Sequence, residues 1–346
     1  MRYLPLTSDD RTAMLAAVEA SSIDDLFVDV PAEVRLDGPI PGLPMHASEL
    51  AVERHMASLA RRNHAAGDGP FFLGAGAYRH HVPASVDHLI QRSEFFTSYT
   101  PYQPEISQGT LQYIFEFQTL VCQLTGMEVS NASVYDGSTA MAEAYLMAQR
   151  VTRRDKIVVA KSVHKEYREV ATTYAQHGDT EIVEIDFDEA TGRIIDTSAL
   201  DNKTAALVVQ SPNFFGCVED LETLAAAAHA VGALFVVVVT EAISFGMLKT
   251  PGACGADIVV GDGQSWGVPM SFGGPHLGLF ATQEKYVRQM PGRLCGETVD
   301  AEGKRGFYKG IDTVKWETFI PNFIYFLVYD LMNGKMNKVC EDYKIR

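Results

Sequence analysis

The sequence predicts an α/β fold in which helices flank a mainly parallel sheet, with a helical arm ahead of it. Two observations predict this fold. After residue 133, apolar runs of strand length alternate with helical patterns, as expected for strands buried on both faces of a parallel sheet. Apolar residues make up 47% of the 346 residues and charged residues 21%, which is the composition of a globular chain with a sizeable core.

The charge balance and the cysteines exclude several classes of function. The formal net charge is −15 at pH 7, and an acidic surface repels phosphates, so no nucleic-acid partner is expected. The five cysteines form no CxxC pair, which is typical of reduced thiols in the cytoplasm. The first residues carry no secretory signal, and no apolar run approaches the roughly 18 residues of a membrane span. We therefore expect a cytoplasmic protein without a membrane partner.

Residues 1–68 are predicted to form a mainly helical arm. Ser8 and the two aspartates after it are typical of a helix start, and apolar residues follow at helical spacing. Proline and glycine punctuate residues 37–44, which favours an extended linker. Ser48 then precedes a second helical pattern, so two helices are expected in the arm.

A large domain is predicted over residues 69–307, and its first segment, PFFLGAGAY at 70–78, could suggest a nicotinamide-binding loop. Arg79 stands where the third glycine of such a loop belongs, so a tight turn is the better interpretation. His80 and His81 are assigned to the surface or a loop, because adjacent histidines rarely point the same way and no third ligand lies nearby. No metal site is expected.

The stretch 95–113, FFTSYTPYQPEISQGTLQY, is predicted to hold a binding loop that leads into a helix over 108–124. Prolines stiffen it, and its many hydrogen-bonding side chains suit a binding role. A structural crossover between two helices is the alternative. The candidate contact residues are Thr100, Tyr102, Gln103, Glu105, Ser107 and Gln108.

Six strands and the helices between them are expected after residue 133. One of the helices is predicted to begin at Gly137, and another covers 222–231. The strand-like runs are 156–160, 182–185, 205–210, 234–239, 257–260 and 277–281.

Three sets of residues match what pyridoxal phosphate (PLP) requires of a protein. Its phosphate needs donors at a helix N-terminus, and Gly137, Ser138 and Thr139 supply them, although a plain helix cap is the alternative. Its ring needs an aromatic or imidazole face, for which His164 is placed after a strand, although a helix-cap histidine fits equally. Its pyridine nitrogen needs a carboxylate, and Glu241 ends a buried strand, with a solvated charge as the alternative.

The fourth requirement, a lysine that binds the cofactor covalently, is missing. The lysine should follow the strand in DIVVGDGQSWGVPMSFGGPHLG, residues 257–278, where Gln264 or Ser265 stands instead. A stand-alone PLP enzyme, such as an aminotransferase, requires that primary amine. The chain is therefore either not a PLP protein or one whose cofactor is held by a partner.

Three long segments closely resemble the alpha chains (subunit 1) of two-subunit glycine dehydrogenase (decarboxylating), the P-protein of the glycine cleavage system. They are FFLGAGAYRHHVP, SEFFTSYTPYQPEISQGTLQYIFEFQTLVCQLTGMEVSNASVYDGSTAMAEA and GADIVVGDGQSWGVPMSFGGPHLGLFA. The resemblance covers about residues 1–307. A loop without lysine is normal in these alpha chains.

The resemblance implies the fold type I PLP-dependent transferase architecture and a role in an enzyme that is inactive without its partner. Subunit 2 would carry the lysine and the PLP. Together the two subunits would decarboxylate glycine, release CO2 and pass the aminomethyl group to the lipoyl group of the H-protein. T-protein and lipoamide dehydrogenase complete the wider system. The residues that match PLP would then be the fold equivalents of a cofactor site, vestigial if subunit 2 alone binds PLP. The loop 100–108 is expected at the subunit interface.

The resemblance ends at about Phe307. Residues 308–346 are predicted to be a divergent tail, consistent with a frameshifted, chimeric or truncated reading frame. The small C-terminal domain of the family is therefore expected to be truncated or replaced. A catalytically inactive partner that still binds subunit 2 is the alternative function.

Overall fold

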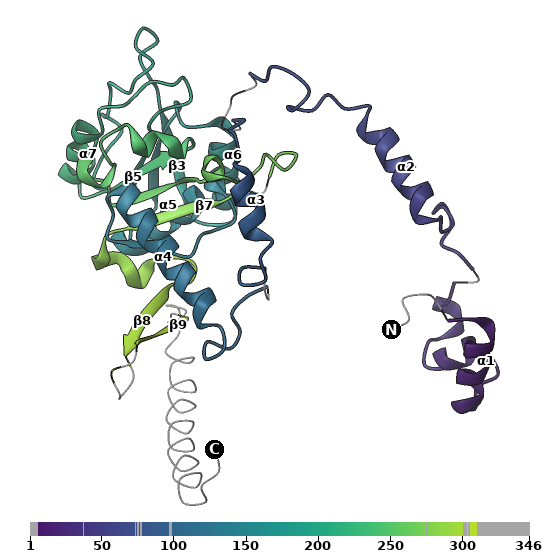
Figure 1. Cartoon of the computed structure of the whole chain (residues 1–346). Helices are drawn as coiled ribbons and strands as arrows, with labels where there is room; N and C mark the ends of the chain where they lie inside the picture. Colours follow the sequence, from purple (N-terminus) through teal and green to yellow (C-terminus); the bar gives the residue numbers. More distant parts are fainter. Residues whose placement is uncertain are drawn as a thin grey trace, which may run out of the picture. The chain divides into compact units, whose positions relative to one another are not determined.

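The computed structural model describes residues 6–36, 38–72, 74, 76, 78–96, 99–274, 276–299, 303 and 305–309. The chain divides into two compact units, Met1–Gly69 and Pro70–Arg346, which are drawn in Figure 1. From residue 310 onward, the predicted tail and the fate of the small C-terminal domain lie outside the described residues.

The first unit contains α1 (Ser8–Ala17) and α2 (Glu49–Ala60), with short 3-10 turns between them. Thr7 caps α1, one residue before the predicted start: its hydroxyl accepts the Asp10 N–H at 3.2 Å, and the Asp10 carboxylate accepts the Thr7 N–H at 3.0 Å. Ser48 caps α2 as predicted. None of the described residues of this unit is buried, so local capping rather than a core defines its helices.

The second unit is built on a seven-stranded sheet in the order β1-β7-β6-β5-β4-β2-β3. Strands β3, β2, β4, β5 and β6 run parallel, whereas β7 pairs antiparallel with both β6 and β1. The mainly parallel sheet is therefore confirmed. A separate antiparallel hairpin joins β8 to β9. The strands are β1 (Val129–Ser130), β2 (Lys156–Ala160), β3 (Glu181–Ile185), β4 (Thr204–Gln210), β5 (Leu234–Val239), β6 (Ile258–Asp262), β7 (Gly278–Thr282), β8 (Cys295–Val299) and β9 (Arg305–Lys309).

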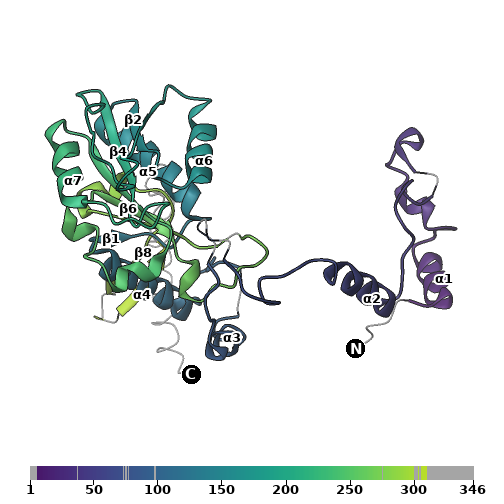
Figure 2. The same cartoon turned by 90° about the horizontal axis from the view of Figure 1, so that it is seen from above.

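Helices cover the sheet on both faces. Helix α5 packs against β4, β5, β6 and β7, and α7 packs against β5. Figures 1 and 2 both place α6 and α7 at opposite sides of this unit. The helices are α3 (Ala84–Ile90), α4 (Gln108–Thr125), α5 (Gly137–Thr152), α6 (Lys165–Ala175) and α7 (Leu221–Ala230), with 3-10 turns η3 (Ala242–Gly246), η4 (Gly252–Cys254), η5 (Gln264–Trp266) and η6 (Glu284–Gln289).

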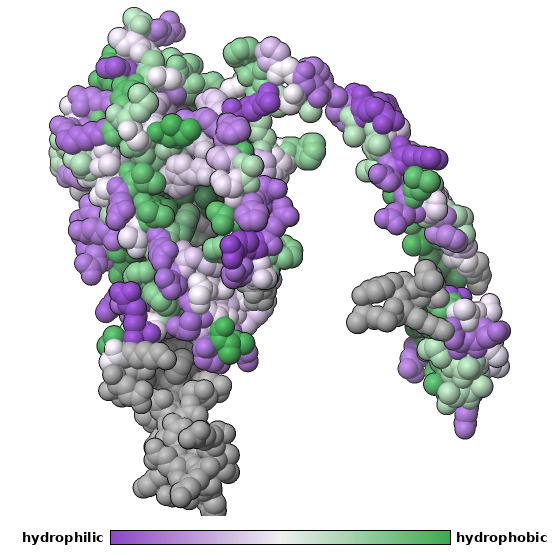
Figure 3. Space-filling view, viewed as in Figure 1, coloured by the Kyte–Doolittle hydropathy of each residue, from purple (hydrophilic) through white to green (hydrophobic). Residues whose placement is uncertain are grey.

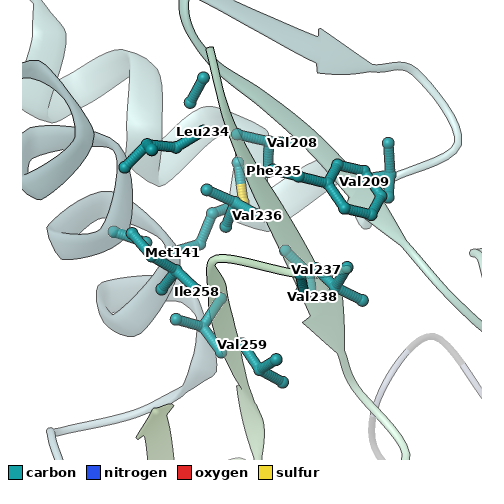
Figure 4. Close-up of a cluster of buried hydrophobic side chains, with 14 of the residues drawn as sticks. Met141, Val208, Val209, Leu234, Phe235, Val236, Val237, Val238, Ile258 and Val259 are labelled. Atoms are coloured by element: carbon teal, nitrogen blue, oxygen red, sulfur yellow. The ribbon is translucent and has the colours of Figure 1, made fainter. Parts of the chain in front are cut away.

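The core lies between the central strands and α5. Every residue of β4 and β5 is buried, and because successive strand side chains point to opposite faces, both faces of the sheet are covered. Met141 of α5 lies among strand side chains that include Val236 and Ile258, as Figure 4 shows. On the outer surface in Figure 3, hydrophobic and hydrophilic residues are intermingled over the viewed face of this unit.

Two glutamines of α4 hold the β8–β9 hairpin. The Gln118 amide donates to the Cys295 carbonyl at 2.9 Å and accepts the Cys295 N–H at 2.8 Å. The Gln108 amide forms the same pair of bonds with Phe307, at 2.9 and 2.8 Å. A primary amide has one donor face and one acceptor face, so each side chain pairs with the hairpin as a neighbouring peptide group would.

Replacing Gln118 with Leu should lower the free energy of unfolding by about 2 kcal/mol or more, because the buried N–H and carbonyl of Cys295 lose their partners. Denaturant unfolding of the full chain measures this change. Gln112→Leu is the matched control: Gln112 is an exposed residue of the same helix that bonds to Glu116, and a change within about 0.5 kcal/mol is expected there. Equal losses in the two variants would contradict the proposed role of Gln118.

Candidate functional site

The carboxyl ends of β2, β4, β5 and β6 gather polar side chains at one edge of the sheet, where open α/β sheets bind ligands. Gln210, buried at the end of β4, connects the segments that follow two of the other strands. Its carbonyl accepts the His164 N–H at 2.8 Å, and its amide donates to the Thr240 hydroxyl at 3.1 Å. The polar cluster is therefore fixed in place by an amide that the sequence analysis treated only as a strand residue.

His164 is buried and begins α6. Its Nδ1 accepts the Glu166 N–H at 3.2 Å, so its side chain caps the helix. Its ring centroid lies 5.2 Å from that of Tyr167 and 5.4 Å from that of Phe214, the latter edge-on. A Cβ at Gly76 would stand 3.1 Å from the His164 ring, so the backbone at Gly76 lies directly against the imidazole. The ring is thus both a helix cap and a packed aromatic element.

Glu241 lies just after β5 and caps η3, accepting the Ile243 N–H at 3.2 Å. Its second carboxylate oxygen lies 2.9 Å from Nε2 of His80, and both side chains are about one quarter exposed. From the sequence, His80 is expected only at the surface or in a loop. The pair spans 161 residues of sequence, and no local pattern marks such a contact.

The start of α5 is capped by the chain's own Asp136. One of its carboxylate oxygens accepts the Thr139 N–H at 2.8 Å and the Ser138 hydroxyl at 2.8 Å. The helix begins at Gly137, as predicted from the sequence. Two of the donors that were expected to face a phosphate therefore face a carboxylate of the same chain.

A second carboxylate, that of Asp262 at the end of β6, also reaches this helix start. It accepts the Gly137 N–H at 3.4 Å through one oxygen and the Gln264 N–H at 2.9 Å through the other. The side chain of His276 lies 3.9 Å away. In the sequence, Asp262 is one residue of the loop-bearing segment 257–278, and no local pattern there indicates that it reaches α5.

Burial raises the pKa of the Asp262 carboxyl above its ordinary value, and the nearby carboxylate of Asp136 adds to that rise. The Gln264 N–H, His276 and the Gly137 N–H oppose it. Burial also raises the pKa of the Tyr167 phenol well above its usual value, with Asp262 and Asp136 adding to the effect. These directions indicate a low-dielectric, electronegative environment at the start of α5.

The position expected for a lysine holds two short polar residues that open η5. The Gln264 amide donates to the Val268 carbonyl at 2.7 Å. The Ser265 hydroxyl oxygen is buried and has no hydrogen-bond partner among the described residues. These two residues offer no primary amine. The missing amine and the carboxylates at the start of α5 mean that this set of residues does not fit PLP.

The loop 99–107 lies ahead of α4 and is formed by tight turns. The Thr100 carbonyl accepts the Tyr102 N–H at 2.9 Å, and the Gln103 carbonyl accepts the Ser107 N–H at 3.1 Å. Tyr102, Gln103 and Glu105 are exposed, whereas Gln108 is engaged with the hairpin and with the Pro104 carbonyl at 2.6 Å.

Neither a metal centre nor a membrane-spanning helix is found in the described part of the chain. No group of three or more His, Cys, Asp or Glu side chains in that part could hold a metal ion. The helices described there are too short or too polar to cross a membrane.

Comparisons with known proteins identify the family. The family model described as "Glycine cleavage system P-protein" matches residues 1–315. A relative from Sphingopyxis alaskensis is 63% identical over 317 residues, which cover 90% of this chain and 70% of the relative. Another from Caulobacter vibrioides strain NA1000 is 62% identical over 317 residues, covering 90% and 69%. Both carry the name "Probable glycine dehydrogenase (decarboxylating) subunit 1".

Solved structures agree with this result. A crystal structure of glycine decarboxylase (P-protein) of the glycine cleavage system, in inhibitor-bound form, has a TM-score of 0.81 and 48% identity, and the match covers 90% of this chain and 69% of that one. The sphingosine-1-phosphate lyase of Burkholderia pseudomallei has a TM-score of 0.50 at 16% identity, covering 81% and 67%, and shows likeness of fold alone. The expected PLP-dependent transferase-like fold is thereby confirmed, and the chain belongs to the glycine cleavage system P-protein family, with subunit 1 chains among its relatives.

Proposed function

We propose that this chain is the lysine-lacking subunit of the two-subunit, glycine-decarboxylating P-protein. With subunit 2 it would decarboxylate glycine, release CO2 and transfer the aminomethyl group to the lipoyl group of the H-protein. T-protein and lipoamide dehydrogenase would complete the system. The observation that supports the proposal is a P-protein fold combined with two residues without an amine, Gln264 and Ser265, where the sequence predicts the cofactor-binding lysine to fall.

In this proposal PLP is held by subunit 2. Bound there, PLP supplies the electron sink that loss of CO2 from an amino acid requires. The residues expected as cofactor ligands on this chain have structural partners instead: His164 caps α6, Glu241 caps η3, and Asp136 holds Ser138 and Thr139. This chain would therefore contribute to the enzyme through the surface that it offers to subunit 2.

We place the main contact with subunit 2 at the loop ahead of α4. Tyr99 is 97% exposed, Tyr102 73% and Ile106 77%, so these large side chains remain in contact with water in the isolated chain. Tyrosine is enriched at the energetic centres of protein interfaces, because its ring buries area while its hydroxyl keeps a polar partner. The turns of the loop and the attachment of α4 to the hairpin hold these side chains in a defined arrangement.

The unit Met1–Gly69 offers a second surface for a partner. Large apolar side chains such as Met14, Leu50 and Met56 are exposed on its helices. Burying them against another protein would recover roughly 25 cal/mol for each Å2 of apolar area removed from water. We propose that this unit also contacts subunit 2 when the enzyme assembles.

The purified chain should show no glycine–bicarbonate exchange when supplied with PLP and H-protein, because it has no amine at the cofactor position. Adding subunit 2 should restore the exchange, which is measured by incorporation of labelled bicarbonate into glycine. Complex formation without exchange would favour the alternative, a catalytically inactive partner of subunit 2. Exchange by this chain alone would contradict the proposal.

Tyr102→Ala should weaken the affinity for subunit 2 by roughly tenfold or more, since truncating a central interface tyrosine costs more than about 1 kcal/mol. Titration calorimetry or sedimentation of the two purified chains gives the Kd. Tyr174→Ala, which truncates a half-exposed tyrosine on α6, is the control and should leave the Kd unchanged. Equal effects of the two substitutions on the Kd would contradict the proposal that the loop lies at the interface.

A further inference from the structure

We infer that this chain closes its own phosphate site with carboxylates: Asp262 and Asp136 occupy the start of α5 and exclude PLP even as a non-covalent ligand. The inference rests on the proposed function and deepens it. The missing amine explains only why PLP forms no covalent bond with this chain, whereas the carboxylates would also prevent non-covalent binding. It concerns binding of phosphate to this chain, and it can fail or hold whether or not the assembled enzyme exchanges bicarbonate.

The donors at the start of α5 already have anionic partners. A helix N-terminus attracts a phosphate through N–H groups that lack partners within the helix and through the helix dipole. Here the Gly137 N–H faces Asp262, while the Thr139 N–H and the Ser138 hydroxyl face Asp136. A phosphate would have to displace these carboxylates or lie beside them, and both arrangements are unfavourable.

The space at this point is also filled. A Cβ added at Gly137 would stand 2.2 Å from the Tyr167 hydroxyl oxygen and 3.0 Å from the carbonyl carbon of Gly261. Asp262 is 5% exposed and Ser138 is 9% exposed, so the helix start faces protein instead of solvent.

The charge around the helix start disfavours another anion. The groups that face it are Asp136 from the cap, Asp262 from β6, Tyr167 from α6 and His276 from the segment before β7. Among these groups there are two carboxylates and one histidine, whose side chain lies 3.9 Å from that of Asp262. The raised pKa of Asp262 shows that this environment already disfavours the charge that it holds. Adding a phosphate would place like charges together in a buried site.

The test measures binding of 4′-deoxypyridoxine 5′-phosphate, a PLP analogue without the aldehyde, and of inorganic phosphate, to the full chain. The wild-type chain should show no saturable binding of either probe. The double variant Asp136→Asn with Asp262→Asn should gain at least roughly tenfold in affinity for the analogue, because two negative charges leave the site. Asparagine keeps an acceptor for the same N–H groups and caps helices as well as aspartate does. The control pair, Asp179→Asn with Asp196→Asn, changes the net charge equally at exposed positions and should gain nothing.

Saturable binding by the wild-type chain as tight as that of the double variant would overturn the inference, as would a folded double variant that gains no affinity. Binding to the wild-type complex with subunit 2 gives an independent answer should the double variant fail to fold. One analogue site for each pair of chains is expected there. Two sites for each pair would overturn the inference.

Discussion

The contact between the carboxylate of Asp262 and the start of α5 organises the strand-end region. It joins β6 to the helix that covers the sheet, and Asp136 completes the cap from the other side. The backbone is packed closely enough there that a Cβ at Gly261 would stand 2.1 Å from the Val239 carbonyl oxygen. Only glycine permits β6 to approach β5 in this way and to bring Asp262 to the helix.

That constraint would explain how a cofactor fold persists in a chain that, as proposed, leaves PLP to subunit 2. A phosphate is one ligand that can satisfy a helix start, and here carboxylates of the chain do so. His164, Glu241 and Gln210 follow the same principle, since each satisfies a backbone or side-chain group of its own chain. The residues expected to bind PLP thus stabilise the scaffold, and the proposed division of labour leaves the chemistry to subunit 2.

The sequence predicts the buried strands well because their signal is local. Strands β2 and β5 match their predicted bounds, since both are continuous apolar runs. Strand β6 extends two residues beyond its predicted end, because Gly261 and Asp262 still pair with β7 although neither favours a strand. Strand β1 and the hairpin of β8 and β9 were missed: a strand of two residues carries no periodicity, and the hairpin depends on glutamines of a distant helix.

The candidate site was predictable only in part. The helix start at Gly137 and the placement of His164 and Glu241 shortly after strands follow from local patterns. Their partners do not, because His80 reaches Glu241 across 161 residues and Asp262 reaches Gly137 of α5 across 125 residues. For that reason the sequence leaves a helix cap open beside a cofactor role for Gly137–Thr139 and His164, and a solvated charge open for Glu241.

The central claim is that the cofactor of the assembled enzyme belongs to subunit 2. It is tested most directly by reducing the PLP-loaded complex with borohydride and mapping the phosphopyridoxyl label by peptide mass spectrometry. The account predicts stoichiometric label on one lysine of subunit 2 and no stoichiometric label on any lysine of this chain. Stoichiometric label on any lysine of this chain would contradict it.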